Sequence, residues 1–178
     1  MNIRFDGRTV IVTGAAHGFG RAIALAFAQR GATVWACDVI EDELAETRGL
    51  CGKSCQTARV DVRDKKAVER FVAEAREVHI LVNNAGGVLG QVGRPLEDVT
   101  PEQWRAIFDV NVTGAFYCSQ AVAPRMKASK FGRIINISSG AGLGVSLTGI
   151  QAYAAAKAAQ IGLTRQLAHE LGDRKSVV

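Results

Sequence analysis

A glycine-rich segment between a predicted strand and a predicted helix is the first place where residue types suggest chemistry. Glycine lets a backbone turn tightly and approach a pyrophosphate, whose charge is stabilised by the free amides at a helix start. The segment therefore predicts a dinucleotide site, although its spacing differs from the commoner Gly-Xaa-Gly-Xaa-Xaa-Gly and it could be only a tight turn. The residues assigned to the site here are Gly14, His17, Gly18, Phe19 and Gly20.

The second candidate is an acidic residue at the end of the second predicted strand. Asp38 follows the glycine-rich turn at close to the expected offset of about 20 residues for a carboxylate that binds a ribose 2′-hydroxyl. Such a carboxylate would repel a 2′-phosphate, so Asp38 favours NAD over NADP, and the adjacent Val39 is assigned to the same cofactor site. Two alternatives remain: Asp38 could only terminate a strand, or His17 could supply a cation for NADP, although histidine is mostly neutral at neutral pH.

A tyrosine and a lysine near the carboxyl end form the third candidate. Tyr153 and Lys157 place a phenol and an ammonium on one face of the last predicted helix. On its own, such a pair is common on helix surfaces. Its context is informative because Ser138 and Ser139 close the fifth predicted strand, at the edge where open α/β sheets place their chemistry.

The elements that must position these residues alternate along the chain. Short β-branched runs and longer amphipathic stretches are typical of an α/β fold, in which helices cover a parallel sheet. The predicted strands are Thr9–Thr13, Thr33–Asp38, Thr57–Asp61, His79–Asn83 and Arg133–Ser138. The predicted helices are Gly18–Arg30, Glu41–Arg48, Lys65–Arg76, Pro101–Met126 with a break inside it, and Gln151–Leu171.

Composition and charge bound the class of protein. The 178 residues are 48% apolar and 22% charged, as in one globular domain over residues 1–178 rather than a disordered chain. No stretch reaches the roughly 18 apolar residues of a membrane span, and the first residues do not form a signal peptide. We therefore expect a cytoplasmic protein with no membrane partner, reduced cysteines and no metal site. The net charge of +5 is spread along the chain, which does not favour a nucleic-acid partner.

The motifs occur in an order that resembles the short-chain dehydrogenase/reductase family. Besides the segments above, the matching motifs are Asp61-Val62, Asn83-Asn84-Ala85-Gly86 and Asn111-Val112-Thr113-Gly114. Each motif is modest, but the ordered set covers nearly the whole chain. The resemblance implies a Rossmann-like, doubly wound parallel sheet of strand order 3-2-1-4-5, flanked by helices.

The resemblance also implies a reaction and a role for each catalytic residue. Hydride would move between NAD and a secondary alcohol or ketone, with Tyr153 as the general acid/base. A neighbouring ammonium favours a phenolate, which explains Lys157 on the same helical face, and Lys157 would also hold the nicotinamide ribose. Ser139 would hydrogen-bond the substrate oxygen, and Asn111 would hold a water that links Lys157 to solvent.

Two points of this assignment stay open. Ser138 could take the serine role, but the glycine that follows the catalytic serine in many relatives matches Gly142 and selects Ser139. Asp61 could be a solvated acid at a strand end. The further residues that the resemblance places beside the cofactor are Asp61 and Val62 at the adenine, Asn84 at the adenosine ribose, and Ala85 and Gly86.

The resemblance ends before the last elements of the family. Relatives continue with another strand, a Pro-Gly motif, a substrate-covering loop and a final strand, so we expect the carboxyl-terminal strands to be missing. Two hypotheses follow. The first is an NAD-dependent oxidoreductase, and the second is a catalytically impaired nucleotide-binding or interaction protein that keeps the fold.

The sequence also gives general expectations about the substrate class and the oligomeric state. We expect residues 140–151 to line the pocket, where Ser146, Thr148 and Gln151 favour a sugar acid or polyol and Leu143 and Val145 favour an apolar substrate. A 3-oxoacyl compound is a further option. The last two predicted helices resemble those through which family members pair, so we expect a homo-oligomer, either a dimer or a tetramer.

Overall fold

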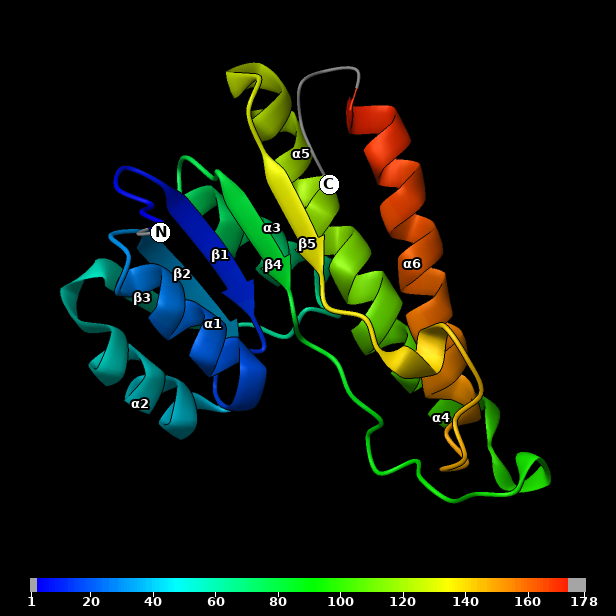
Figure 1. Ribbon diagram of the computed structural model, residues 1–178. Helices are drawn as coiled ribbons and strands as arrows, with labels where there is room; N and C mark the ends of the chain where they lie inside the picture. Colours follow the sequence, from blue (N-terminus) through cyan, green and yellow to red (C-terminus); the bar gives the residue numbers. More distant parts are fainter. Residues whose placement is uncertain (1–2, 173–178) are drawn as a thin grey trace.

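The computed structural model describes residues 3–172, in which short strands form one parallel sheet (Figure 1). The strands are β1 (Thr9–Thr13), β2 (Thr33–Asp38), β3 (Cys55–Arg59), β4 (Ile80–Asn83) and β5 (Arg133–Asn136). Their order across the sheet is β3-β2-β1-β4-β5, which confirms the predicted α/β fold and strand order. Because all neighbouring pairs are parallel, the carboxyl ends of the strands meet at one edge.

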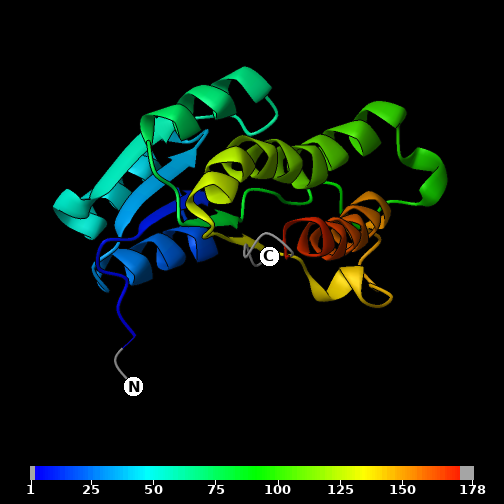
Figure 2. The ribbon, with the colours of Figure 1, turned by 90° about the horizontal axis from the view of Figure 1, so that it is seen from above.

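Helices cover the sheet from both sides. The α-helices of the described region are α1 (Gly18–Ala28), α2 (Glu41–Cys51), α3 (Lys65–Glu74), α4 (Pro101–Phe108), α5 (Gly114–Ser129) and α6 (Gln151–Gly172). In Figure 1, α1 and α2 lie in front of the sheet and α3 and α5 lie behind it, while α6 lies beyond β5. Figure 2 shows α1 and α5 on opposite faces.

Each face of the sheet contributes to its own apolar core. Along β1, Val10 and Val12 pack on the side of α1 and α2, whereas Ile11 packs on the side of α3 and α5. This alternation follows from the twofold side-chain repeat of a strand. All three side chains are at most 1% exposed, as expected for a strand covered on both faces.

Several predicted boundaries are corrected by the structure. β3 runs from Cys55 to Arg59, and its last residue, Arg59, pairs with Asp38 at the end of β2. Asp61 therefore lies beyond the strand. β5 ends at Asn136, so both serines also follow their strand. The break expected within Pro101–Met126 is present as a π-helical turn at Asp109–Thr113, which joins α4 to α5, and α5 extends to Ser129.

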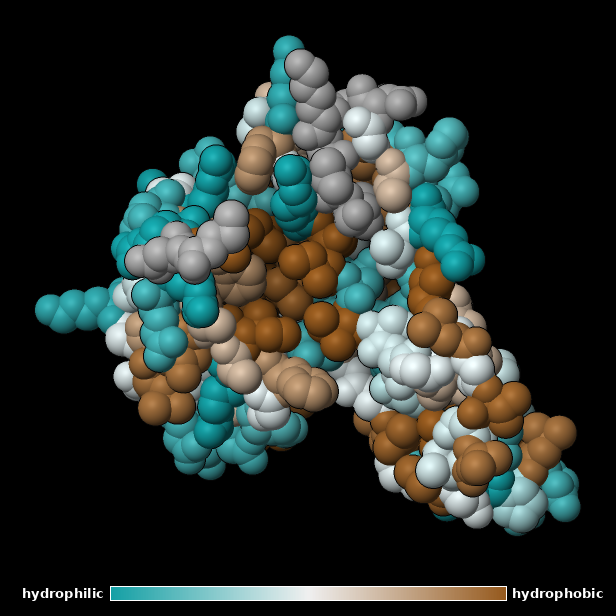
Figure 3. Space-filling model, in the orientation of Figure 1, coloured by the Kyte–Doolittle hydropathy of each residue, from teal (hydrophilic) through white to brown (hydrophobic). Residues whose placement is uncertain are grey.

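One part of the sheet has no helix over it. The α1-side face of β5 is not covered by a helix within residues 3–172 (Figure 1), and Figure 3 shows apolar surface gathered in the hollow there. Ile135 of β5 is 42% exposed there. The carboxyl-terminal strands that the resemblance would add are absent from the described part of the chain. None of the helices described is long and apolar enough to cross a membrane.

Candidate active site

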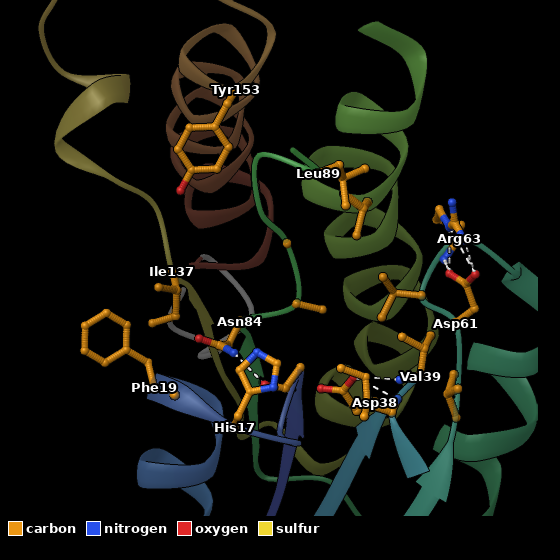
Figure 4. Close-up of a pocket in the computed structure, with 18 of the residues that line it drawn as sticks. His17, Phe19, Asp38, Val39, Asp61, Arg63, Asn84, Leu89, Ile137 and Tyr153 are labelled. Atoms are coloured by element: carbon orange, nitrogen blue, oxygen red, sulfur yellow. Dashed lines mark hydrogen bonds and ion pairs between the residues drawn. The ribbon is translucent and has the colours of Figure 1, made fainter. Parts of the chain in front are cut away.

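A cavity of about 740 Å³ opens at the carboxyl edge of the sheet (Figure 4). It runs from the glycine-rich turn to α6, so it joins segments that lie far apart in the sequence. Most predicted site residues line it, namely Gly14, His17, Gly18, Phe19, Asp38, Val39, Asp61, Val62, Asn84, Ala85, Gly86, Ser139, Tyr153 and Lys157. Two predicted residues, Gly20 and Asn111, do not line the cavity, and each supports its wall from behind.

The glycine-rich turn brings the start of α1 against the end of β4. A Cβ on Gly14 would lie 2.7 Å from the Cα of Ala85, and one on Gly20 would lie 1.9 Å from the Gly14 carbonyl oxygen. Gly20 therefore serves the packing of the turn. Gly18 has φ +55° and no atom within 4 Å of the place of a Cβ. The turn thus leaves room beside the first amides of α1, which suits a pyrophosphate.

Asp38 is held in place by backbone amides. Its Oδ2 accepts a hydrogen bond from the Ala16 amide at 2.9 Å, and its Oδ1 accepts from those of Val39 and Ile40 at 2.7 and 3.2 Å. The carboxylate therefore has a fixed orientation at the cavity wall. A carboxylate has about four acceptor positions, so at least one remains for a hydroxyl.

Two further side-chain pairs lie along the same wall. The Nδ1 of His17 is 2.6 Å from Oε2 of Glu43, so His17 already has an acidic partner. Arg63 donates from Nη2 to Oδ2 of Asp61 at 2.6 Å and from Nε to Oδ1 at 2.9 Å. The Arg63 hydrogen bonds hold the pKa of the Asp61 carboxyl below its usual value. Asp61 is therefore an ion-paired acid in a loop and not a free one.

Tyr153 and Lys157 meet at the other end of the cavity. Figure 4 shows the Tyr153 hydroxyl directed into it. Lys157 is only 4% exposed, and burial lowers the pKa of its ammonium from 10.5 to about 8. Its Nζ lies 5.4 Å from the centre of the Tyr153 ring and donates to the Ile137 carbonyl at 2.8 Å. The four-residue spacing of Tyr153 and Lys157 on α6 thus places a buried ammonium beside the phenol.

The two serines differ in how their hydroxyls are used. Ser138 donates its hydroxyl to the Lys157 carbonyl at 3.0 Å. The Ser139 oxygen accepts from the Ala141 amide at 3.2 Å, so its hydroxyl proton stays available. A Cβ on Gly142 would lie 2.7 Å from the Lys157 carbonyl carbon, so this glycine lets the short helix η4 (Gly140–Gly142) approach α6. These contacts favour Ser139 over Ser138 for contact with a substrate.

The sequence of this chain matches a known protein family. The family described as short chain dehydrogenase matches residues 8–178. The chain belongs to this family. It is 39% identical over 173 residues to the oxidoreductase UcpA of Salmonella typhimurium, covering 94% of this chain and 65% of that protein. It is 38% identical over 179 residues to the 3-oxoacyl-[acyl-carrier-protein] reductase FabG of Thermotoga maritima, covering 97% and 71%. The chain therefore spans about two thirds of the length of these relatives.

A solved structure of the family agrees with the fold. The 3-ketoacyl-(acyl-carrier-protein) reductase from Brucella melitensis, complexed with NADH, superposes with a TM-score of 0.90 at 30% sequence identity. The match covers 96% of this chain and 73% of that chain. The resemblance to short-chain dehydrogenases inferred from the motifs is thereby confirmed.

Asn111 of this short-chain dehydrogenase lies behind the cavity wall. It is fully buried in the π-helical turn, and its Nδ2 donates to the carbonyls of Gly87 and Ile107, both at 2.9 Å. Its Oδ1 accepts from the Gly87 amide at 3.1 Å. The Asn111 side chain thus fixes the loop after β4. Short π-helical segments within helices are frequent at functional sites.

Residues 140–151 do not line the cavity, contrary to expectation. Ser146 and Thr148 hydrogen-bond each other at 2.8 Å, and Gln151 donates to the Arg94 carbonyl at 2.7 Å. Val145 is 92% exposed. The loop packs against the segment after β4 and points its apolar side chains outward, so its composition says little about the lining of this cavity.

Some lining residues were missed from the sequence. They are Ile40, Val60, Arg63, Leu89, Val110 and Ile137. Arg63 could have been found because it directly follows Asp61-Val62, whereas the apolar residues carry no local signal. Within residues 3–172, no group of His, Cys, Asp and Glu side chains could hold a metal ion.

Proposed function

We propose that this short-chain dehydrogenase is an NAD-dependent oxidoreductase that transfers hydride between NAD and a secondary alcohol or ketone. The observation that carries the proposal is the single cavity that joins the glycine-rich turn and Asp38 to Ser139, Tyr153 and Lys157. The bound nicotinamide would supply the hydride acceptor or donor. The space beside Gly18 and the fixed carboxylate of Asp38 fit a dinucleotide without a 2′-phosphate.

The proposed roles follow from the contacts at the α6 end. Tyr153 takes the proton of the alcohol during oxidation and returns it during reduction. Lys157, held as a buried ammonium, stabilises the phenolate that this transfer creates. Ser139 donates its free hydroxyl proton to the substrate oxygen and stabilises charge that develops there. Asn111 holds the loop at Gly87 in place beside these groups.

The choice of NAD rests on charge at the ribose end of the cavity. Asp38 is a fixed carboxylate there, and the nearby imidazole of His17 is bound to Glu43. The carboxylate of Asp38 would repel a 2′-phosphate, and His17 is already paired with Glu43 and would not neutralise that phosphate.

The experiment that tests the function has two steps. NADH and NADPH are titrated by the change in their fluorescence, and a panel of secondary alcohols is then oxidised with NAD. We expect NADH to bind at least about tenfold more tightly than NADPH, a difference of about 1.4 kcal/mol, and at least one alcohol to be oxidised. Equal or reversed affinities would contradict the cofactor choice.

A second candidate function is nucleotide binding or interaction without turnover. The observation that favours it is the α1-side face of β5, which no helix covers within residues 3–172 and where Ile135 is 42% exposed. NADH binding in the titration with no oxidation of any alcohol, and no reduction of the matching ketones by NADH, would select this candidate.

Substrate class, assembly and compartment belong to the same proposal. The similarity to FabG supports a 3-oxoacyl substrate, whereas the polar residues of loop 140–151 lie outside the cavity lining and no longer support a sugar acid or polyol. We propose a cytoplasmic homo-oligomer, a dimer or tetramer, that pairs through α4, α5 and α6 and has neither a nucleic-acid nor a membrane partner. Phe116 of α5, which is 40% exposed, fits such an interface.

A further inference from the structure

We propose that Gln160 is a positioning residue that holds the ammonium of Lys157 in its charged form beside Tyr153. The inference rests on the proposed function, because it gives Lys157 a partner within the site described above. It adds a residue that no sequence motif pointed to. The contact, the burial and an unpaired amide on Gln160 carry the argument.

The contact is direct and lies in the interior. Gln160 follows Lys157 by nearly one helical turn on α6 and is fully buried. The Lys157 Nζ donates to Gln160 Oε1 at 2.9 Å and to the Ile137 carbonyl at 2.8 Å. An ammonium has three N–H donors, so one remains for the phenol or a ribose hydroxyl. The ammonium is thereby fixed between α6 and the segment that follows β5.

The other end of the Gln160 amide has no partner. Its Nε2 is buried and makes no hydrogen bond within the described residues. Turning the amide over would place this nitrogen against the ammonium of Lys157, so that contact dictates the orientation. A buried amide without a partner destabilises a fold. Packing alone would therefore favour an aliphatic residue here, and the hydrogen bond to Lys157 accounts for the glutamine.

The electrostatic setting explains why Lys157 needs an acceptor. Burial disfavours its charged form, and an acceptor for the ammonium opposes this effect. The groups that face the ammonium from neighbouring elements are uncharged: Gly86 after β4, Asn111 in the π-turn and the Ile137 carbonyl. The titratable neighbour is Tyr153, on α6 itself. Two neutral oxygen atoms, including Gln160 Oε1, therefore support the charge.

The test replaces the acceptor and measures the pKa of Lys157 directly. Gln160→Leu removes the acceptor at similar volume, Gln160→Glu offers a charged one, and Gln166→Leu is the same change at an exposed position of α6. The ε-carbon of lysine is followed by ¹³C NMR across pH in the protein without cofactor, and Lys157→Met identifies the signal. We expect the pKa to fall by about one pH unit in Gln160→Leu, to rise in Gln160→Glu and to stay unchanged in Gln166→Leu.

Stability and cofactor binding separate positioning from a merely structural role. At pH 10, where Lys157 is neutral in both folded proteins, Gln160→Leu should unfold at the same or a higher urea concentration than the wild type, because the unpaired amide is gone. At pH 7 it should bind NADH several-fold more weakly. A structural glutamine would show the reverse: lower stability with an unaltered pKa of Lys157. If Gln160→Leu does not fold, Gln160→Glu carries the test alone.

The outcomes distinguish this inference from the proposed function. An unchanged pKa of Lys157 in Gln160→Leu, or in Gln160→Glu, overturns the role of Gln160 whatever the protein binds. The expected shifts, observed in a protein that binds neither NADH nor NADPH, support the Gln160 contact and overturn the proposed function instead.

Discussion

At the scale of single residues, the chemistry depends on one phenolic oxygen. Tyr153→Phe removes only that oxygen, and the ring keeps its contacts with the small core around Ile107 and Ala156. We expect turnover to fall about 10²–10⁴-fold, the usual contribution of general acid–base catalysis, while NADH affinity changes less than about twofold. Initial rates and a fluorescence titration on the same preparation measure both. A variant that still turned over at the wild-type rate would remove Tyr153 from the mechanism.

Cofactor discrimination also belongs to a single side chain. Asp38→Asn keeps an oxygen that can accept from the neighbouring amides and loses the charge, whereas Asp38→Ala loses both. We expect Asp38→Asn to bring the NADPH affinity to within about threefold of the NADH affinity, because the repulsion of a 2′-phosphate disappears. Asp38→Ala should in addition weaken NADH binding. If Asp38→Asn kept the full preference for NADH, discrimination would lie in another residue.

The buried ammonium of Lys157 predicts a dependence of stability on pH. Its folded pKa of about 8 is below its ordinary value of 10.5, so between these pH values the unfolded chain binds more protons. Stability from this group therefore rises as pH increases from about 8 to about 10.5, and the full destabilisation is present below pH 8. Urea unfolding of wild type and Lys157→Met at pH 7 and pH 10 measures this.

The difference in unfolding free energy between wild type and Lys157→Met isolates the contribution of the Lys157 ammonium. Buried Cys37, Cys55 and Cys118 also have raised pKa values, but they titrate alike in both proteins and cancel. We expect Lys157→Met to have its greatest advantage in stability over wild type at pH 7, and a smaller one at pH 10. A difference that did not change with pH would show that Lys157 is not destabilised by burial.

At the scale of elements, the site depends on the close contact between η4 and α6. Gly142→Ala would place a Cβ 2.7 Å from the Lys157 carbonyl carbon and 2.8 Å from the Ala158 amide nitrogen. The helix backbone cannot yield, so η4 must move and carry Ser139 with it. We expect a loss of about 1–3 kcal/mol in unfolding free energy and a matching loss of activity.

A neighbouring glycine provides the control for that element. Gly140 has no atom within 4 Å of the place of a Cβ, so Gly140→Ala should leave both stability and turnover near the wild-type values. Urea unfolding and initial rates compare the two variants. Equal effects of the two substitutions would show that the η4 contact with α6 does not position Ser139.

At the scale of the whole molecule, two apolar surfaces bear on assembly. Phe116 projects from α5 and Ile135 from the open face of the sheet, with exposures of 40% and 42%. We expect Phe116→Glu to convert a discrete oligomer into a monomer. Ile135→Lys should instead reduce larger aggregates, because within residues 3–172 the α1-side face of β5 is uncovered and its outer edge has no partner strand, and such surfaces promote non-specific association. Light scattering over a range of protein concentrations distinguishes these effects, and a wild type that is monomeric throughout would refute the homo-oligomer.

Much of the fold could be predicted from sequence because its signals are local. Continuous apolar runs such as Val10–Val12 identify strands buried on both faces, and a capping residue before Pro101 marks the start of α4. The glycine-rich turn, Asp38, Tyr153 and Lys157 lie in or beside such elements. Parallel strands bring their carboxyl ends to one edge, so the sequence by itself determined that these residues line one cavity.

Other features were decided only by tertiary structure, because they depend on contacts between distant segments. Nothing near Gln160 in the sequence indicates that its amide is buried against Lys157, with the Ile137 carbonyl on the same ammonium. The register of β3 depends on β2. The loop 140–151 was misplaced because its polar composition did not reveal that it packs on the segment after β4. Local pattern specifies which elements form, whereas packing between elements specifies which side chains they bring into contact.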